Sequence, residues 1–191
     1  MRLRLANLIA ILCLLTANGA VAAHALLPEL SGARLNSSGG GLGSQVSVSH
    51  GAKGTVLVFL SATCPCSHSH IGLLKRLSAK HPAFNFFAVN SNANESTEIA
   101  RAYFEAQQLS FPVLRDTDLK IADAYHASKT PHAIVLDLKN EVVYRGGVTN
   151  SSKADQADKQ YLESALNDIE AGRPVATPES RTLGCVISRG D

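Results

Sequence analysis

The sequence lacks several features that would point to particular classes of protein. It contains no tryptophan, its one methionine is the initiator, and it shows no internal repeat. It also lacks a charge bias, with 18 basic and 16 acidic residues. Removal of Arg2 and Arg4 with a leader peptide would leave 16 of each sign. This balance argues against nucleic acid or an anionic membrane surface as the main partner.

The N-terminal residues resemble a secretory signal peptide and lack the length of a membrane span. Arg2 and Arg4 form a basic region, and the apolar run at residues 5–15 is shorter than the roughly 20 residues that a span needs. Residues 20–25 offer small-residue cleavage positions of the A-x-A type. We therefore expect residues 1–25 to be removed on export to a periplasmic or extracellular location, with no stable membrane insertion afterwards.

Cysteine is scarce, and the number left after cleavage is odd. Loss of Cys13 leaves Cys64, Cys66 and Cys185. Three thiols in an exported chain cannot all pair within it, so one must stay free, pair with another molecule or cycle between states. An oxidising compartment permits both a structural disulfide and a redox role.

What the sequence does contain is a buried strand that turns into a helix at two cysteines. Residues 56–60 form the continuous apolar run of a strand buried on both faces. After Cys64 and Cys66, the apolar residues between 71 and 77 take helical spacing. A thiolate at a helix start faces unpaired N–H groups and the positive end of the helix dipole, so its pKa should fall below about 8.5. Cys64 is therefore the candidate nucleophile.

The remaining elements predict one α/β domain over residues 26–172. Strands are expected at 84–89, 111–114, 133–137 and 141–146, and helices at 95–108, 118–126 and 159–171. Residues 26–44 are expected to be a flexible lead-in, with a short edge strand near Val46, and residues 173–191 a tail that carries Cys185. Parallel βαβ units followed by a hairpin and a helix predict a central mixed sheet covered on both faces by helices.

Two local features are also predicted for the second half of the domain. In the helix at 95–108, Ile99, Ala102, Tyr103 and Ala106 should form the apolar stripe. Asp118 can cap the short helix that follows.

The cysteine turn between strand and helix resembles the active-site segment of the thioredoxin-like superfamily. In register with Phe59, Cys64 takes the place of the attacking cysteine. Ser67 falls where thioredoxin has its second cysteine, so the usual C-x-x-C pair is absent and Cys66 is an additional thiol. Residues 111–116, FPVLRD, resemble the redoxin branch related to alkyl hydroperoxide reductase and thiol-specific antioxidant (AhpC/TSA) proteins. The Gly-Cys-x-Ile sequence around Cys185 resembles the ending of some exported redoxin-like proteins.

This resemblance implies a thioredoxin-like fold and thiol–disulfide exchange without a bound cofactor. Thr130 and Pro131 take the place of the cis-proline loop that holds a substrate backbone beside Cys64. Cys64 would attack a protein or small-molecule disulfide, and Cys66 or Cys185 would resolve the mixed disulfide. At about 3.3 Å per residue, the tail is long enough for Cys185 to return to the Cys64 end of the sheet.

The roles of the cysteines leave alternatives open. Cys66 could pair with Cys64, bind a metal or only pack, and Cys185 could pair between molecules or stay free. Peroxide reduction is a further alternative, because peroxiredoxins resemble the chain in a Thr-x-x-Cys sequence before the helix. Here Ser61 stands in the threonine position, and Arg145 is a candidate for the arginine of a later strand.

Copper binding or delivery is the other alternative function. Cys64, Cys66 and His68 form a ligand set of the kind that suits Cu(I) or Zn. Copper-delivery members of the superfamily carry two cysteines four residues apart, and His68 stands where the second of these would be. His132, next to Pro131, either lies near Cys64 or simply begins a core strand.

Overall fold

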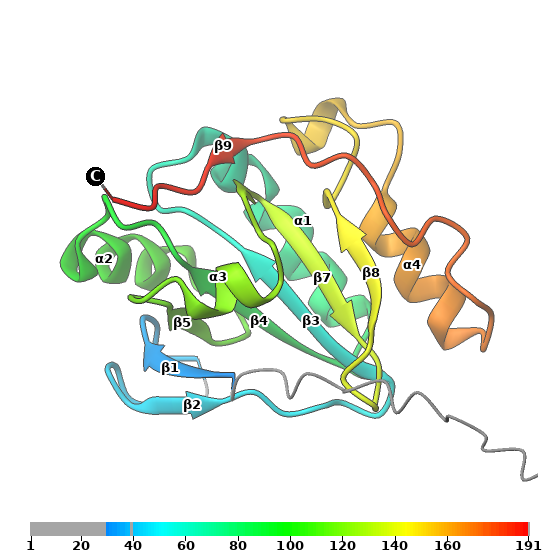
Figure 1. Cartoon of the computed structure of the whole chain (residues 1–191), viewed down its shortest axis with the longest axis horizontal. Coiled ribbons are helices and arrows are strands. Elements are labelled where there is room, and N and C mark those ends of the chain that lie inside the picture. Colours follow the sequence, from blue (N-terminus) through cyan, green and yellow to red (C-terminus); the bar gives the residue numbers. More distant parts are fainter. Residues whose placement is uncertain (1–29, 39, 191) are drawn as a thin grey trace, which may run out of the picture.

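The strand that leads to Cys64 lies inside a seven-stranded sheet (Figure 1). The computed structural model describes residues 30–38 and 40–190. β3 (Gly54–Phe59) is buried along its whole length, between β4 (Phe84–Asn90), which is parallel to it, and β7 (His132–Leu136), which is antiparallel. The sheet order is β2-β1-β5-β4-β3-β7-β8, with β2 at Gln45–Ser47, β1 at Ser31–Arg34, β5 at Val113–Arg115 and β8 at Val142–Gly146.

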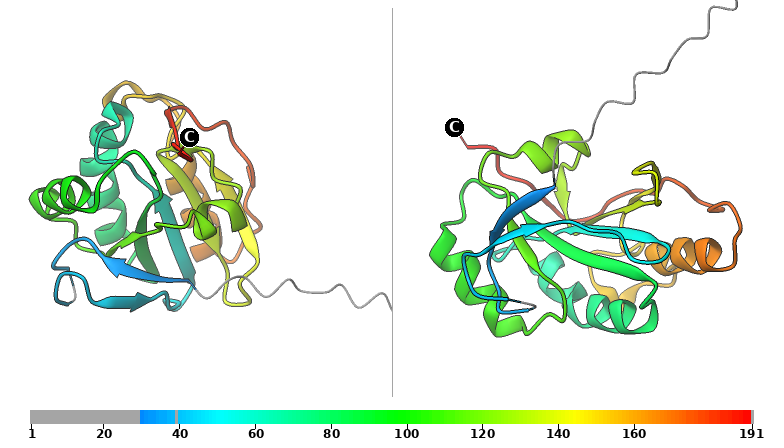
Figure 2. Two further views of the ribbon diagram at one scale, coloured as in Figure 1. Left: turned by 60° about the vertical axis from the view of Figure 1, so that its left-hand side comes forward. Right: turned by 90° about the horizontal axis from the view of Figure 1, so that it is seen from below.

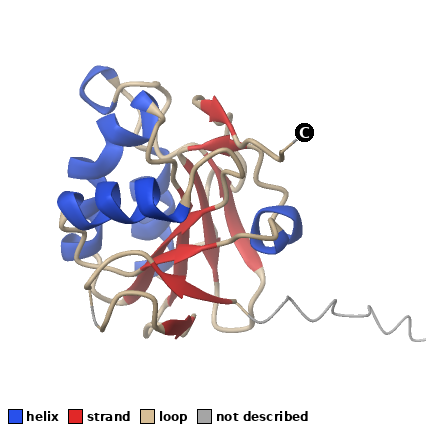
Figure 3. Ribbon diagram, turned by 90° about the vertical axis from the view of Figure 1, so that its left-hand side faces the viewer, coloured by secondary structure: helices blue, strands red, loops and turns tan. Residues whose placement is uncertain are grey.

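Alternate residues of β3 contribute to two separate cores, because neighbouring side chains of a strand point to opposite faces. Val56 and Val58 pack with three helices, which are α1 (Pro65–Lys80), α2 (Thr97–Gln107) and α4 (Tyr161–Glu170). Leu57 and Phe59 pack with the short α3 (Lys120–Ala124) and with Ile187 of the tail. Helices therefore lie on both faces of the sheet (Figure 3), and the predicted α/β architecture is confirmed.

The first two strands correct one prediction and confirm another. Residues 26–44 were expected to be a flexible lead-in, but their described part contains β1, which pairs with β5. Leu35 is fully buried in the larger core, so this segment is part of the folded domain. β2 forms the predicted edge strand and buries Val46. The predicted signal peptide, residues 1–25, lies outside the described residues.

The two local predictions for the middle of the chain are also corrected. In α2, Ala100 and Phe104 face the core, whereas Ile99 is 53% exposed, because the larger aromatic ring sets which face packs on the sheet. The start of α3 is capped by the buried Asp116 and not by Asp118. The Asp116 carboxylate accepts hydrogen bonds from two backbone N–H groups of this turn, at 3.0 and 3.1 Å.

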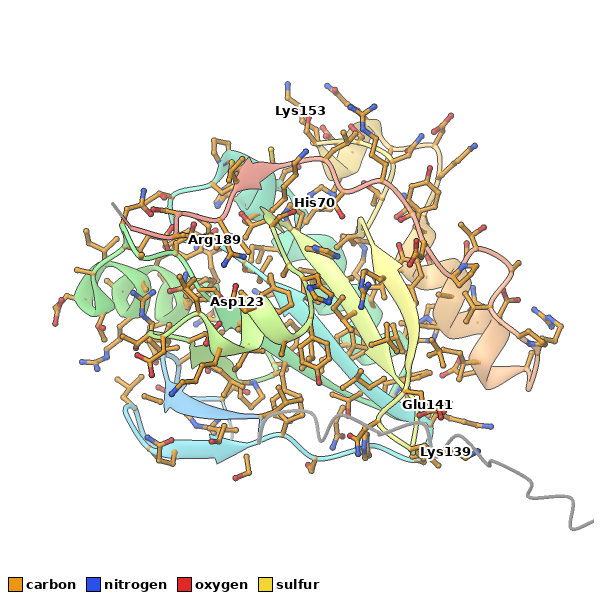
Figure 4. All side chains as sticks on the ribbon, in the orientation of Figure 1. His70, Asp123, Lys139, Glu141, Lys153 and Arg189 are labelled. Carbon is orange, nitrogen blue, oxygen red and sulfur yellow. A yellow bond between two sulfur atoms is a disulfide. The ribbon has the colours of Figure 1, made fainter. Side chains whose placement is uncertain are left out.

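The tail is folded onto the domain and runs back towards the start of α1 (Figures 1 and 2). It first pairs with the backbone of Arg145 in β8 and then forms β9 (Cys185–Val186), which pairs antiparallel with β6 (Lys129–Thr130). Arg189 then forms an ion pair with Asp123 of α3 (Figure 4). The part of the chain that the structure describes contains no helix with the length and hydropathy of a membrane span.

Candidate active site

Cys64 occupies the predicted position between strand and helix. It is the N-cap residue of α1, Pro65 takes the first helical position, and the cysteine side chain is 3% exposed. Proline suits this position because the N–H group that it lacks would have no partner within the helix. Cys64 forms a disulfide with Cys185, 121 residues further along the chain, with their Cα atoms 6.0 Å apart. The tail therefore returns to the Cys64 end of the sheet.

Cys66 lies beside this disulfide. It is in the first turn of α1, is half-buried and is not bonded to another cysteine. The sulfur atoms of Cys64, Cys66 and Cys185 all lie within 4.8 Å of one another. All three cysteines of the predicted site are thus gathered at one point, and Cys185 rather than Cys66 is the disulfide partner of Cys64.

The Thr130-Pro131 loop packs directly against Cys64. The peptide bond between these residues is cis, as the resemblance implied. The carbonyl oxygen of Thr130 lies 3.3 Å from the sulfur of Cys64, and Thr130 is the register partner of Cys185 in the β6–β9 pair. The loop therefore contacts both halves of the disulfide.

The tail docks on this loop as a short added strand. A side chain at Gly184 would collide with the carbonyl group of Thr130, so only glycine permits this close approach. The N–H of Ile187 donates to the carbonyl of Ser128 at 2.9 Å, and its side chain is 1% exposed in the smaller core. Val186 between them is 72% exposed, as the alternation of a strand requires.

Glu95 holds the turn before Cys64, and sequence reasoning did not identify this role. Its carboxylate, 2% exposed, accepts hydrogen bonds from the hydroxyl groups of Ser61 and Thr63 and from the N–H groups of Ala62 and Thr63. Asn90 donates a further bond at 2.7 Å. The one signal in the sequence is position, because Glu95 follows β4 at the sheet edge where β3 leads to Cys64.

The charge of Glu95 is stabilised in this setting. Burial alone would raise the pKa of its carboxyl group, but the hydrogen bonds from the turn and from Asn90 outweigh burial and leave the pKa below its ordinary value. Burial and the Glu95 charge raise the pKa of nearby Tyr103 to about 12, so its hydroxyl group keeps its proton.

Two further polar residues of α1, Ser67 and His70, are buried and contact neighbouring backbone and hydroxyl groups. Ser67, in the position of the second thioredoxin cysteine, is fully buried and accepts a hydrogen bond from the N–H of Ser61 at 3.1 Å. His70, labelled in Figure 4, contacts the carbonyl of Cys66 and the hydroxyl of Thr149, and burial lowers its pKa. Both residues therefore fix the first turns of α1.

Of the candidates for metal and peroxide chemistry, His68 lies apart from the cysteine cluster, whereas Arg145 and His132 lie in strands as the sequence allowed. The Nδ1 atom of His68 lies 3.2 Å from the Tyr103 hydroxyl, and among the described residues His68 does not belong to the cluster of Cys64 and Cys66. Arg145 lies within β8, opposite Ile134. His132 begins β7, where burial and the charge of Arg145 lower its pKa to about 4, so it is neutral at neutral pH.

A cysteine at the start of the helix after a central strand, packed against a cis-proline loop, defines a protein of the thioredoxin-like fold with a thiol–disulfide centre. A family model described as Redoxin matches residues 25–162, which is more than half of the chain. The chain therefore belongs to the Redoxin family, in agreement with the resemblance found in the sequence.

Three relatives illustrate what the chain is similar to. It is 27% identical over 113 residues to thiol-disulfide oxidoreductase ResA of Halalkalibacterium halodurans, a match that covers 58% of this chain and 61% of that protein. The match thus spans less than two thirds of that relative's length. The crystal structure of an uncharacterized conserved protein from Geobacillus kaustophilus has a TM-score of 0.70 at 27% identity, covering 86% of this chain and 93% of that one. A secreted Mycobacterium tuberculosis disulfide oxidoreductase, with a TM-score of 0.50 at 20% identity over 60% of this chain and 80% of that one, shares the fold.

Proposed function

We propose that the protein is a thiol–disulfide oxidoreductase that acts outside the cytoplasm after removal of residues 1–25. Cys64 is the nucleophile and Cys185 the thiol that resolves the mixed disulfide. The observation that carries this proposal is the Cys64–Cys185 disulfide, which lies at a helix start and against a cis-proline loop. The similarity to ResA of Halalkalibacterium halodurans supports the same reaction class.

The reaction starts from the reduced protein and balances as two thiol–disulfide exchanges. The Cys64 thiolate attacks one sulfur of a substrate disulfide, and the other substrate sulfur leaves as a thiolate that takes a proton. The Cys185 thiolate then attacks the sulfur of Cys64 and releases the second substrate thiol. The substrate gains two electrons and two protons, and the protein keeps the Cys64–Cys185 disulfide. The reverse sequence oxidises a dithiol.

The substrate backbone is proposed to pair with Thr130, beside Pro131, where β9 now lies. In the oxidised protein this edge is occupied by Gly184 and Cys185, so the tail must leave before a substrate strand can pair there. The contacts of the tail therefore describe the substrate that would fit best, an extended protein segment with a small residue before its cysteine. Extended segments commonly bind by adding a strand to an exposed edge.

Serine variants of the three cysteines test the assignment. Reduced protein is mixed with disulfide-bonded insulin, and thiol release and mixed disulfides are measured by mass spectrometry. Cys64→Ser should abolish thiol release, and Cys185→Ser should accumulate insulin bound through Cys64. Cys66→Ser is the matched control, since it removes a neighbouring thiol but leaves the proposed pair intact, and it should not trap substrate. Thiol release by Cys64→Ser at the wild-type rate would refute the proposal.

A further inference from the structure

The three sulfur atoms at the site form a cluster that a disulfide alone does not explain. Cys64, Cys66 and Cys185 come from the helix N-cap, the first helical turn and the tail, yet their sulfurs lie within 4.8 Å of one another. Cys64 is buried, whereas Cys66 and Cys185 are half-buried, so a small ion could reach the cluster from solvent. Reduction of the disulfide would leave three free thiols at this point.

The spacing is suited to a metal ion bound by three thiolates. Metal–thiolate bonds are about 2.3 Å long, so three sulfurs in a plane around one ion are about 4.0 Å apart. This separation lies inside the present limit of 4.8 Å. The sulfur of Cys66 already lies within 4.8 Å of both other sulfurs, and reduction releases Cys64 and Cys185 from their direct bond.

The composition of the cluster selects the metal. Thiolates are soft ligands that favour Cu(I), Zn and iron–sulfur clusters. Structural zinc takes four ligands, and among residues 30–38 and 40–190 no histidine, aspartate, glutamate or fourth cysteine completes the group. Three thiolates without a fourth ligand match a three-coordinate Cu(I) ion. The N-terminus of the 16-residue α1 offsets the negative charge of such a site.

We propose that the reduced protein binds one Cu(I) ion through Cys64, Cys66 and Cys185. A dithiol reductant first transfers two electrons and two protons to the Cys64–Cys185 disulfide and becomes a disulfide itself. Cu(I) binding then displaces one proton from each of the three thiols, with no change in the oxidation state of copper. The disulfide and the ion use the same two sulfurs, so the two states exclude each other. His68, the ligand that sequence spacing had offered, is replaced by Cys185.

A Cu(I) titration tests the composition of this site. Full-length mature protein is reduced with a phosphine under anaerobic conditions and titrated with Cu(I) against bicinchoninate as a chromogenic competitor. We expect one ion per protein and at least tenfold weaker binding by Cys66→Ser. His68→Ala is the matched control and should bind as the wild type does. The proposal is overturned if Cys66→Ser binds as tightly as the wild type, or if His68→Ala weakens binding as much as Cys66→Ser.

Two further measurements keep the result independent of variant folding and of any exchange activity. X-ray absorption of the wild-type protein loaded with Cu(I) should show three sulfur neighbours, whereas two would refute the proposal. Free Cu(I) at 100 times its dissociation constant should favour the reduced protein by about 100-fold. This factor raises the midpoint potential of the Cys64–Cys185 disulfide by about 60 mV. An unchanged midpoint would contradict the shared use of these sulfurs.

Discussion

Replacement of Glu95 by glutamine should destabilise the protein through the turn that precedes Cys64. One carboxylate oxygen accepts from Ala62 N–H and Asn90 Nδ2, and the other from the Ser61 hydroxyl and both donors of Thr63. Glutamine keeps the shape but removes the charge from all five hydrogen bonds and turns one oxygen into a donor, so at least one backbone N–H, of Ala62 or Thr63, also loses its acceptor. Hydrogen bonds to charged groups contribute about 1.5–3 kcal/mol each, so we expect a loss of about 3 kcal/mol or more in the free energy of unfolding.

The pH dependence of the free energy of unfolding provides a second, independent test of the role of Glu95. The pKa of Glu95 is lower in the folded protein than its ordinary value of 4.5. Its charge therefore contributes stability that is fully present above about pH 4.5 and is lost as the pH falls through the folded-state pKa. Glu95→Gln cannot lose this contribution, so the gap in stability between wild type and variant should be largest at neutral pH and should narrow on acidification.

Urea denaturation of the disulfide-bonded protein at pH 7 and at pH 4 measures both effects. Glu98→Gln is the matched control, because Glu98 lies three residues further on and is exposed. For a chain of this size, a loss of about 3 kcal/mol corresponds to a melting temperature lower by roughly 6–12 °C. Equal urea midpoints for the two variants at pH 7 would refute the assigned role of Glu95, and a gap that widens at low pH would refute its charge state.

Three further predictions concern the cysteines and the N-terminus. Cys64 should have the lowest thiol pKa of the three mature cysteines, because it alone is the helix N-cap; alkylation rate against pH in single-cysteine variants measures this, and a Cys185-only variant that titrates as low would contradict it. The helix dipole supplies at most about one and a half pKa units of this difference. Cys185→Ser should lower the free energy of unfolding by up to about 5 kcal/mol, because the disulfide closes a loop across 121 residues. Urea denaturation of the wild type with and without reductant should then give free energies of unfolding that differ by a similar amount. Equal urea midpoints under the two conditions would contradict the prediction. N-terminal sequencing of exported protein should give a start between residues 23 and 26, and recovery of intact Met1 from the cytosol would contradict export.

Sequence patterns predicted the parts of the fold that local periodicity determines. β3 and α1 were found because an unbroken apolar run and helical spacing meet at Cys64, and the hairpin of β7 and β8 followed from two apolar runs around a short turn. The cis bond before Pro131 came from the family resemblance, because no local pattern distinguishes it. The length of the tail allowed Cys185 to reach Cys64, but the β6–β9 register that brings it there is a contact between distant segments.

The failures share a physical cause, which is that burial depends on tertiary contacts. Glu95 was placed in the first turn of a helix, where acidic residues are common, and four of its five hydrogen-bond donors lie more than 30 residues away. Ile99 was assigned to the core by its apolarity, yet it is exposed, because Phe104 occupies the face of α2 that packs on the core. β1 was missed because its four residues, SGAR, carry no strand periodicity and are ordered by pairing with β5.

The tethering of β9 has a consequence for competition at the site. Any strand that pairs with Thr130 must displace a segment that belongs to the same chain and is anchored by Ile187. A short tether holds such a segment at an effective concentration on the order of millimolar, so a freely diffusing peptide of equal intrinsic affinity is outcompeted at micromolar concentrations. For the proposed exchange reaction, the tail therefore disfavours dilute peptides that pair only at Thr130 and favours partners that also dock elsewhere on the protein before their cysteine reaches Cys64.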